Sequence, residues 1–423
     1  MGIEKIKWML LAFLCGLLST SANDTLPTTD KRILNIAIIG AGASGLASAK
    51  NAIEQGHNVV IFEKGEALGG IWYYTDQIGE GIHSPMYSDL RTNTPYKNME
   101  FPGHHFPEGT EMFPTHDVVW QYLDSYADEF GLKDHIKYHH LVVHVQSIDG
   151  DKWQIFVNDM QTNYTIMETF DAVFVCTGFC SSPLYPNIPG EFKGKILMHS
   201  HDYRTPDKFE GEKVLVIGGG TSGTDIVHQI RGIAKRVTHS YHIPSEKSSL
   251  AQKALDKARG IFSKGDNGIT HKGDVKRFTK NGAEFSDGTK KNFTVVIFAT
   301  GYKYSYPFLD ENVGICAHDF YVEPLFKEIL NIEHNTMAFI GLPITVAHNP
   351  MYDLQARFAL KFISGEKQFP SQTKMRQDLQ KQINANAEFH LKKPYMLGLD
   401  YKRYFRELAK TANIENVPNI RSG

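Results

Sequence analysis

The sequence predicts an α/β fold with two nucleotide-binding units, the second inserted into a discontinuous first unit. Three observations support this prediction. Two glycine-rich turns, Gly40-Ala41-Gly42-Ala43-Ser44-Gly45 and Gly218-Gly219-Gly220-Thr221-Ser222-Gly223, each follow an apolar, β-branched run. Each turn opens a stretch with helical spacing, which is the strand–turn–helix order of a dinucleotide-binding motif. The dipeptide Thr-Gly then ends an apolar run twice, at residues 177–178 and 300–301, and after the second of these we expect the chain to return to the first unit.

The chain is long enough for two or three domains and is close to electrically neutral. It has 423 residues, of which 41% are hydrophobic and 22% charged, and its formal net charge is −2. That length supports a sizeable core. No basic run interleaved with aromatic residues is present, so the composition argues against nucleic acid as a partner.

The first residues predict a secretory signal peptide spanning residues 1–22. Lys5 and Lys7 precede an apolar run at residues 8–18, and Thr20-Ser21-Ala22 offers a small-residue cleavage site. The run is too short to span a bilayer comfortably, although an uncleaved membrane anchor is the alternative. We therefore expect a soluble, secreted (extracellular) protein without a stable membrane anchor. Three N-glycosylation sequons are compatible with that route, at Asn23, Asn163 and Asn292.

Cysteine and histidine usage predicts neither a disulfide framework nor a metal site. Beyond the signal peptide only Cys176, Cys180 and Cys316 remain, an odd and sparse count. Cys176 ends an apolar run before a glycine turn and is expected to pack as a small hydrophobe. The clustered histidines lack the spacing of a helical zinc pair, so we expect them to pack or to face solvent. They are His139, His140, His144, His199 and His201.

The first unit is predicted to begin in the order strand, helix, strand. The expected elements are a strand at residues 33–39, a helix at residues 44–55 that ends at Gly56, and a strand at residues 59–62. Farther on, residues 115–130 have helical spacing, and residues 141–177 alternate in short runs typical of antiparallel strands.

The second unit repeats this order. Residues 213–217, 221–231 and 237–241 are interpreted as strand, helix and strand, and a hairpin is expected around residues 280–288. A last apolar strand is expected at residues 295–299. The predicted organisation is a first unit at residues 33–206 and 303–410, with the second unit at residues 207–302 between them.

The first glycine turn has the sequence context of a pyrophosphate cradle. Gly40 permits the tight turn, Gly42 lets backbone amides approach the phosphates, and Gly45 lets helix and strand pack closely. The helix N-terminus adds unpaired N–H groups and the positive end of the helix dipole. Glu63, at the end of the next strand, is placed to accept hydrogen bonds from a ribose diol.

The second unit lacks this carboxylate. The equivalent position holds Tyr241, and its neighbours include Arg236, His239, Ser240 and His242. A carboxylate here would repel a 2′-phosphate, whereas these residues would not, so NADP is favoured over NAD. We place Ser240 among the expected cofactor contacts. Asp225, on the helix that follows the second glycine turn, is interpreted as a packing or capping residue.

These residues resemble the flavin-containing monooxygenase family over nearly the whole mature chain. Phe192-x-Gly194-x-x-x-His199-x-x-x-Tyr203 is similar to the identifying motif of that family. Gly69-Gly70-Ile71-Trp72 is similar to its flavin segment, and Leu90-Arg91-Thr92-Asn93-Thr94-Pro95 to the segment whose asparagine lies beside the reactive flavin carbon. Residues 298–302 and 354–357 resemble two further family segments.

The resemblance implies an enzyme with two Rossmann-like domains. The first unit would bind FAD and the second unit NADPH. Gly70, Ile71, Trp72, Thr92, Asn93 and Thr94 would contact the flavin, with Asn93 as the catalytic residue. A C4a-hydroperoxyflavin formed with dioxygen would pass one oxygen atom to a nucleophilic amine or sulfide, so no protein nucleophile is needed. The chain departs from the family at His242, where an arginine often stands, and this weakens the NADPH assignment.

Within the family, the chain resembles soluble insect members that carry a signal peptide, some of which N-oxygenate plant pyrrolizidine alkaloids in detoxification. This predicts N-oxygenation of tertiary amines, with broad N- and S-oxygenation of xenobiotics as an alternative. A flavin-linked disulfide reductase would need a dithiol after the first glycine unit, which the sequence lacks. A secreted flavin or alkaloid carrier without turnover stays open, as does assembly into a homo-oligomer.

Overall fold

The structure is a computed structural model that describes residues 32–79, 81–149, 152–242, 268–345, 347–388, 396–398 and 401–418. The elements below belong to the unit that begins at Leu34. The predicted signal peptide and the sequon at Asn23 lie outside the described residues. No helix among the described residues has the length and apolar character needed to cross a membrane.

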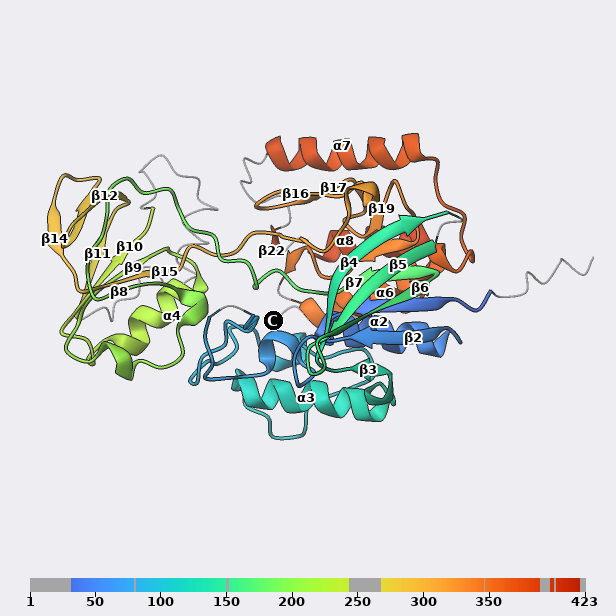
Figure 1. Ribbon diagram of the computed structural model, residues 1–423, viewed down its shortest axis with the longest axis horizontal. Coiled ribbons are helices and arrows are strands. Elements are labelled where there is room, and N and C mark those ends of the chain that lie inside the picture. The colour runs from blue at the N-terminus through green and yellow to red at the C-terminus, as the bar shows by residue number, and fades with distance from the viewer. Residues whose placement is uncertain are drawn as a thin grey trace, which may run out of the picture. The chain divides into compact units, whose positions relative to one another are not determined.

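A seven-stranded sheet organises the first unit (Figure 1). Its order is β18 (Leu325–Phe326), β19 (Leu330–Asn331), β20 (Met337–Phe339), β7 (Ala172–Val175), β1 (Asn35–Ile39), β2 (Asn58–Phe62) and β3 (Ile136–Lys137). The strands from β20 to β3 are parallel. They are buried runs of Ile, Val, Phe and Ala, as parallel strands covered on both faces require. Because β20 comes from the C-terminal part of the chain, the predicted discontinuity of this unit is confirmed.

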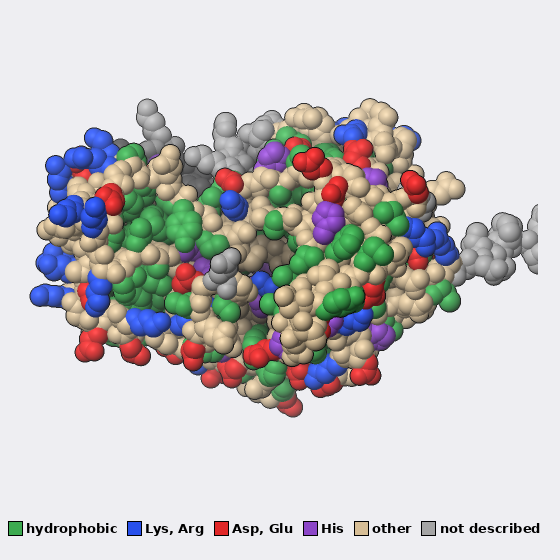
Figure 2. All heavy atoms as spheres, viewed as in Figure 1, with side chains coloured by type: hydrophobic (Ala, Val, Ile, Leu, Met, Phe, Trp, Pro, Cys, Tyr) green, Lys and Arg blue, Asp and Glu red, His purple; other side chains and the backbone are tan. Residues whose placement is uncertain are grey.

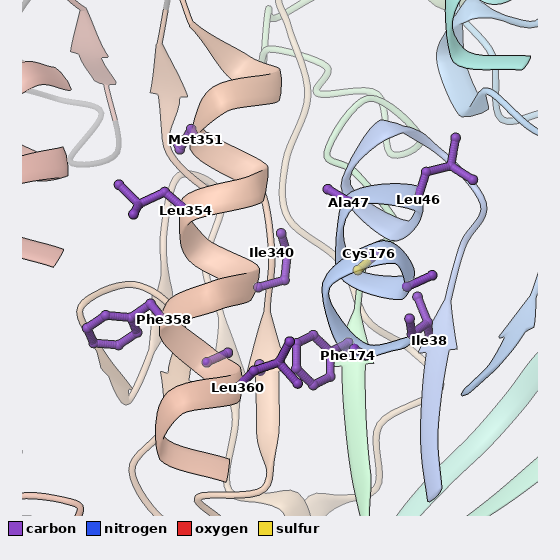
Figure 3. Packing of buried hydrophobic residues seen from close by; sticks show 14 of the residues in the cluster. Ile38, Leu46, Ala47, Phe174, Cys176, Ile340, Met351, Leu354, Phe358 and Leu360 are labelled. Carbon is purple, nitrogen blue, oxygen red and sulfur yellow. The ribbon is translucent and has the colours of Figure 1, made fainter. Parts of the chain in front are cut away.

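Two helices pack together on this sheet. They are α2 (Ala43–Glu54) and α6 (His348–Ile363), which lie side by side. Figure 3 shows Ile38 and Phe174 of the strands directed toward this helical layer. Small alanines on α2 permit a close approach, and Asn51 of α2 donates to Asp353 of α6 over 2.9 Å.

The described residues of the first unit contain three further α-helices. They are α3 (His116–Glu129), α7 (Gln372–Glu388) and α8 (Tyr401–Ala412). The helix expected at residues 115–130 is α3, with Thr115 and Phe130 as its flanking caps. Its apolar residues share one buried face, which includes Val119, Tyr122 and Leu123.

An antiparallel sheet covers the other side of the first core. It consists of β4 (His140–Ile148), β5 (Lys152–Asp159) and β6 (Tyr164–Phe170). Alternation in β5 buries Trp153, Ile155 and Val157 under the sheet, as the sequence pattern predicts. Asn163 has φ 55° at the β5–β6 turn, a conformation that asparagine tolerates well.

The second unit is built on a five-stranded parallel sheet. Its order is β11 (Ile269–Lys272), β10 (Arg236–Ser240), β9 (Lys213–Ile217), β15 (Val295–Phe298) and β8 (Ile196–His199). Helix α4 (Thr221–Ile230) follows β9. The bounds of the two units stay a prediction, and this sheet also contains β8, which precedes residue 207.

The hairpin expected near residues 280–288 is part of a three-stranded antiparallel sheet. Its strands are β12 (Val275–Thr279), β13 (Gly282–Phe285) and β14 (Lys290–Asn292). Lys276, Arg277 and Lys290 surround the Glu284 carboxylate. Figure 2 shows Lys and Arg side chains gathered at the left of the view, where β12 and β14 lie in Figure 1.

The remaining elements are short. They are the strands β16 (Cys316–Ala317), β17 (Val322–Glu323), β21 (Ile344–Thr345) and β22 (Met396–Gly398), and the 3₁₀ turns Gly70–Trp72, Tyr96–Asn98, Lys133–His135, Ser200–Asp202, Asp207–Phe209 and Glu311–Val313.

Candidate active site

The first glycine turn is sterically restricted to glycine at two positions. Gly40 has φ 105°, and a Cβ there would lie 2.7 Å from the Cys176 carbonyl oxygen. A Cβ on Gly45 would lie 1.9 Å from the Gly40 carbonyl oxygen. Ala43 and Ser44 begin helix α2 and are buried, and Ala41 is fully buried before them. No side chain caps the start of α2, so its first N–H groups face the cradle that the sequence predicts.

Glu63 lies where the sequence places it, at the carboxyl end of β2. Its side chain is buried, and its two oxygens accept hydrogen bonds from the backbone N–H groups of Ala41, at 2.8 Å, and Gly65, at 2.7 Å. Each carboxylate oxygen has a second lone pair for a further donor. The carboxylate is thus held against the glycine turn, in the position that ribose binding requires.

The Gly69-Gly70-Ile71-Trp72 segment packs against the first glycine turn. Gly69 donates its N–H to the Ala41 carbonyl over 2.9 Å. A Cβ on Gly70 would lie 3.0 Å from the Gly42 Cα, so the two glycines allow the segments to meet. Ile71 is exposed, and Trp72 packs against the first core while staying half-buried. The structure therefore brings the predicted flavin segment and the first turn together.

The Asn93 loop is anchored through its neighbours while the Asn93 side chain stays exposed. Thr92 is buried, its N–H donates to the Pro114 carbonyl over 2.9 Å, and its hydroxyl donates to the Thr94 carbonyl over 2.9 Å. The side-chain Oδ1 of Asn93 accepts a long hydrogen bond of 3.4 Å from the Thr94 hydroxyl. An accessible amide on a restrained loop suits a residue that donates to a bound group, and this role stays a prediction.

The second glycine turn repeats the constraints of the first. Gly218 has φ 127°, and a Cβ there would lie 2.1 Å from the Ala299 carbonyl oxygen. A Cβ on Gly223 would lie 2.0 Å from the Gly218 carbonyl oxygen. Gly220, in contrast, has open space at its Cβ position, which leaves room for a phosphate to approach. Gly219 and Ser222 are half-buried and Thr221 is exposed at the start of α4.

The end of β10 carries no carboxylate. Tyr241 is buried there, and its N–H donates to the Lys272 carbonyl, just as the Glu63 N–H donates to Lys137. Ser240 is fully buried, and its hydroxyl donates to the Gly273 carbonyl over 2.8 Å. Its side chain is therefore engaged within the protein, and its predicted cofactor contact has no support from this geometry. His242 is exposed and lies 3.0 Å from Asp274.

The Phe192-x-Gly194-x-x-x-His199-x-x-x-Tyr203 motif lies in the sequence between β7 of the first sheet and β9 of the second sheet, and it includes β8. A Cβ on Gly194 would lie 2.1 Å from the Phe192 ring, so glycine allows that ring to fold back. His199 is fully buried, and burial and the nearby His201 lower its pKa to about 4, which keeps its ring neutral. Tyr203 is fully buried and donates to Gln229 over 2.8 Å.

Helix α6 adds a second helix N-terminus that the sequence analysis did not assign to the site. Parallel pairing of β1, β7 and β20 puts their carboxyl ends at one edge of the sheet, and both α2 and α6 begin beyond this edge. No side chain caps the start of α6. Pro350 lies in the first turn of α6, and proline near the start of a helix is a signal that the sequence alone could have offered. Asn349 there donates to the Met99 carbonyl over 2.6 Å, which ties α6 to the chain just after Asn93.

The Leu354-Gln355-Ala356-Arg357 segment has a structural explanation. Gln355 is fully buried, accepts the Gly341 N–H over 2.9 Å and donates to the Tyr404 hydroxyl over 2.8 Å. The Arg357 guanidinium donates to the carbonyls of Glu415 and Asn416. These contacts join α6 to the end of β20 and to the C-terminal helix.

Thiols and metal ligands contribute little to this site. Cys176 is buried in the core below the first turn, and burial raises its pKa to about 12. Cys180 and Cys316 also stand as free thiols. Within the part of the chain that the structure describes, no three His, Cys, Asp or Glu side chains are grouped to hold a metal ion.

A pocket of about 810 Å³ lies apart from the predicted cofactor residues. It is lined by residues 303–307 and 317–321, and the His318 ring stacks on Tyr321 at 4.2 Å. None of the glycine-turn residues lines it, so its volume says nothing about cofactor binding.

The residues present fit two dinucleotides. Each uncapped helix start, with glycines where a Cβ would collide, can take a pyrophosphate, and Glu63 can take the ribose of the first one. The absence of a carboxylate at Tyr241 is compatible with a 2′-phosphate on the second.

Known proteins with similar sequences and structures support this interpretation. The chain matches the family model described as flavin-binding monooxygenase-like over residues 32–247 and 264–422. It is 37% identical to senecionine N-oxygenase of Tyria jacobaeae, with 91% of this chain and 84% of the relative covered. The solved S-allyl-L-cysteine S-oxygenase from Allium sativum superposes with a TM-score of 0.82 at 28% identity, covering 92% of this chain and 90% of that one. Tmm from Pelagibacter sp. strain HTCC7211 gives a TM-score of 0.77 at 29% identity, covering 91% and 87%.

These matches span both sheets and confirm the predicted fold class and cofactors. They also favour an enzyme over a carrier without turnover. The chain therefore belongs to the flavin-binding monooxygenase-like family and is a flavin-dependent monooxygenase that uses FAD and NADPH.

Proposed function

We propose that this protein N-oxygenates tertiary amines of the plant pyrrolizidine alkaloid class, such as senecionine. The observation that carries this proposal is the 37% identity to senecionine N-oxygenase of Tyria jacobaeae over 399 residues. The aligned region takes in 91% of the chain. The similarity therefore extends well beyond the glycine turns that many dinucleotide-binding proteins share.

The chain's own residues bind and position, while the cofactors supply the redox chemistry. Bound FAD, reduced by NADPH, would activate dioxygen, a chemistry that no amino-acid side chain offers. The first turn and Glu63, whose carboxylate is held by the Ala41 and Gly65 N–H groups, would hold the flavin dinucleotide. The exposed Asn93 amide would donate a hydrogen bond at the reacting end. The amine nitrogen needs only its lone pair, so the site requires no protein base.

S-oxygenation is a second candidate, and one observation favours it. The solved structure with a TM-score of 0.82 is that of an S-allyl-L-cysteine S-oxygenase. A thioether sulfur offers a lone pair to the same oxygen atom as an amine nitrogen does. The two candidates therefore differ in the fit of the substrate rather than in the chemistry of the cofactor.

A product panel tests the proposal. The FAD-loaded enzyme is incubated with NADPH, dioxygen and an equimolar mixture of a pyrrolizidine alkaloid, a simple tertiary amine and a thioether, and the products are identified by mass spectrometry. We expect the alkaloid N-oxide as the main product. A sulfoxide as the main product would support the second candidate, and the absence of any oxygenated product would refute both.

Asn93 provides the internal control for this experiment. Asn93→Ala should lower N-oxide formation by about 100-fold, the effect typical of losing one hydrogen-bond donor to a reacting group. Lys97→Ala removes an exposed side chain from the same segment and should leave the rate unchanged. Equal rates in wild type and Asn93→Ala would refute the role of Asn93.

We also propose that residues 1–22 direct the protein into the secretory route and are then cleaved off. Asn163, at a β-turn, and Asn292, in β14, are both exposed and so accessible to glycosylation. Expression in secretory insect cells, with N-terminal sequencing of the protein in the medium, tests this proposal. Removing N-glycans should shift the mass of the wild type, and Asn163→Gln with Asn292→Gln should reduce that shift. Retention of residues 1–22 in the cell fraction would refute secretion.

A further inference from the structure

The segment that leads to Asn93 is packed into the core of the second unit. Tyr87 is buried in the cluster that contains Val214, Ile226 and Val227 of the second unit, and Leu90 packs against the same cluster. Asn93 follows within the same loop, although the sequence analysis assigns it to the flavin of the first unit. The Asn93 segment is therefore in contact with both units.

A partly buried chain of hydrogen bonds joins this segment to helix α4. The Tyr87 hydroxyl donates to the Asp225 carboxylate over 2.5 Å, and the Gln229 amide donates to the same oxygen over 3.3 Å. The Tyr203 hydroxyl then donates to the Gln229 carbonyl oxygen over 2.8 Å. The rings of Tyr87 and Tyr203 meet edge to face with centroids 5.4 Å apart. Asp225 is thus the packing partner that the sequence suggested, and its partner is the Asn93 segment.

A second anchor lies one residue farther along. Ser88 donates both its N–H and its hydroxyl to the Arg204 carbonyl, over 3.0 Å and 3.3 Å. The Arg204 side chain is buried, and its guanidinium donates to the carbonyls of Thr75, Gln77 and Ser84. These bonds hold the backbone at Ser88, the residue after Tyr87, against the buried Arg204.

The far end of the segment is also restrained. His116, at the start of α3, contacts the Ser88 carbonyl through its ring at 3.1 Å and donates its N–H to the Leu90 carbonyl over 3.2 Å.

Burial and the Asp225 carboxylate raise the pKa of Tyr87, so its hydroxyl stays a proton donor across the working pH range. A phenylalanine would fill the same space, and only the bond to Asp225 would be lost.

We propose that Tyr87 and Asp225 are positioning residues that make the Asn93 segment follow helix α4, so that a dinucleotide seated at the N-terminus of α4 steadies Asn93. This inference rests on the proposed role of Asn93. Coupling between two sites is reciprocal, so an ordered Asn93 segment also strengthens binding of the dinucleotide. Loss of the bond leaves two intact binding sites that no longer respond to each other.

Hydrogen exchange on the FAD-loaded protein tests the coupling without turnover. Exchange is followed with and without NADP⁺ in two regions, helix α4 with its C-terminal flanking residue (residues 221–231) and the Asn93 segment (residues 86–96). In the wild type we expect NADP⁺ to slow exchange in both regions. In Tyr87→Phe and Asp225→Ala we expect slowing at residues 221–231 alone.

Matched variants separate coupling from stability. Asp225→Asn keeps an oxygen that can accept from both Tyr87 and Gln229, so it should restore the response of residues 86–96. Tyr122→Phe removes another buried hydroxyl, which donates to the His104 carbonyl over 3.1 Å inside the first unit. It should lose stability much as Tyr87→Phe does and keep the coupled response.

The same variants should differ in their kinetics. Tyr87→Phe and Asp225→Ala are expected to raise the KM for NADPH by about tenfold, within the usual size of coupling between sites, and to release more hydrogen peroxide per NADPH consumed. Tyr122→Phe should change neither quantity.

Slowed exchange at residues 86–96 in Tyr87→Phe, equal to that of the wild type, would overturn the inference alone. Failure of NADP⁺ to slow exchange at residues 221–231 in the wild type would overturn the cofactor assignment of the second turn, and the inference with it.

Discussion

The two glycine cradles share their backbone geometry and differ in the side chain at the end of the next strand. In each cradle the last glycine, Gly45 or Gly223, lies so close to the first that a Cβ would come within 1.9 Å or 2.0 Å of its carbonyl oxygen. The strand ends differ, because Glu63 presents a carboxylate bonded to two backbone N–H groups and Tyr241 presents a buried ring. Sterics thus determine the turn, and the strand-end charge selects the dinucleotide.

The largest effects are expected from the last glycine of each turn. Gly45→Ala and Gly223→Ala each force a backbone shift, because their Cβ atoms collide with carbonyl oxygens. We expect Gly45→Ala to yield protein without bound flavin. Gly223→Ala should keep its flavin and lose NADPH affinity by about tenfold or more, since the damage is confined to the second cradle.

Visible flavin absorbance per protein and NADPH titration measure these outcomes. Gly220→Ala is the matched control, because its Cβ meets no protein atom. It should leave thermal stability unchanged and weaken only dinucleotide binding. If Gly223→Ala released the flavin as Gly45→Ala does, the two cradles would not be separate sites.

Glu63→Gln comes next, because it removes the charge that holds the first turn. The amide can accept from only one of the two N–H groups of Ala41 and Gly65, and its NH₂ opposes the other. Hydrogen bonds to charged groups contribute about 1.5–3 kcal/mol, so FAD should dissociate more readily by about tenfold to a hundredfold. Flavin fluorescence on dilution gives the dissociation constant, and an unchanged value would show that the ribose does not use this carboxylate.

Tyr241→Glu transfers the feature of the first cradle to the second. A carboxylate there should repel a 2′-phosphate and accept from a ribose diol. We expect the ratio of kcat/KM for NADPH over NADH to fall by roughly tenfold, the effect of one such contact. Tyr241→Gln is the neutral control for loss of the buried ring. An equal fall in Tyr241→Gln would assign the effect to packing instead of charge.

Glu328 sharpens the contrast with Glu63, because it is a buried carboxyl without two backbone donors. Burial raises its pKa to about 8, and one of its oxygens has no hydrogen-bond partner. A pKa raised in the folded state gives stability that is fully present below the unfolded value of 4.5 and is lost as pH rises through about 8. The wild-type unfolding free energy should therefore fall between these values by at most about 1.4 kcal/mol per pH unit.

Glu328→Gln should flatten this slope, which chemical denaturation at pH 5, 7 and 9 can measure. The prediction fails if wild type and variant lose stability in parallel over that range.

The sequence supported more of the fold than of the site. Predicted strands and helices around both turns are present within about two residues, as pattern-based boundaries usually are. Residues 115–130 became α3, and the alternation near residues 152–159 became β5. These elements follow from local hydrophobic periodicity, which can be recognised in a short stretch of sequence without knowing its tertiary contacts.

The site residues that were missed depend on contacts between distant segments. The start of α6 joins the flavin side only because β20 pairs in parallel with β7. The Ser240 hydroxyl, at the end of β10, donates to the Gly273 carbonyl, so its cofactor contact stays a prediction without support from this geometry. Sequence spacing cannot show which side of a strand end is already occupied.

By itself the sequence determined the two dinucleotide turns, the carboxylate at one strand end and its absence at the other, since each depends on a few consecutive residues. Only the tertiary structure decided that the Asn93 segment packs into the second unit and bonds to Asp225. The physical reason is that backbone sterics and strand-end chemistry act locally, whereas burial and hydrogen bonds between remote residues exist only once the chain has folded.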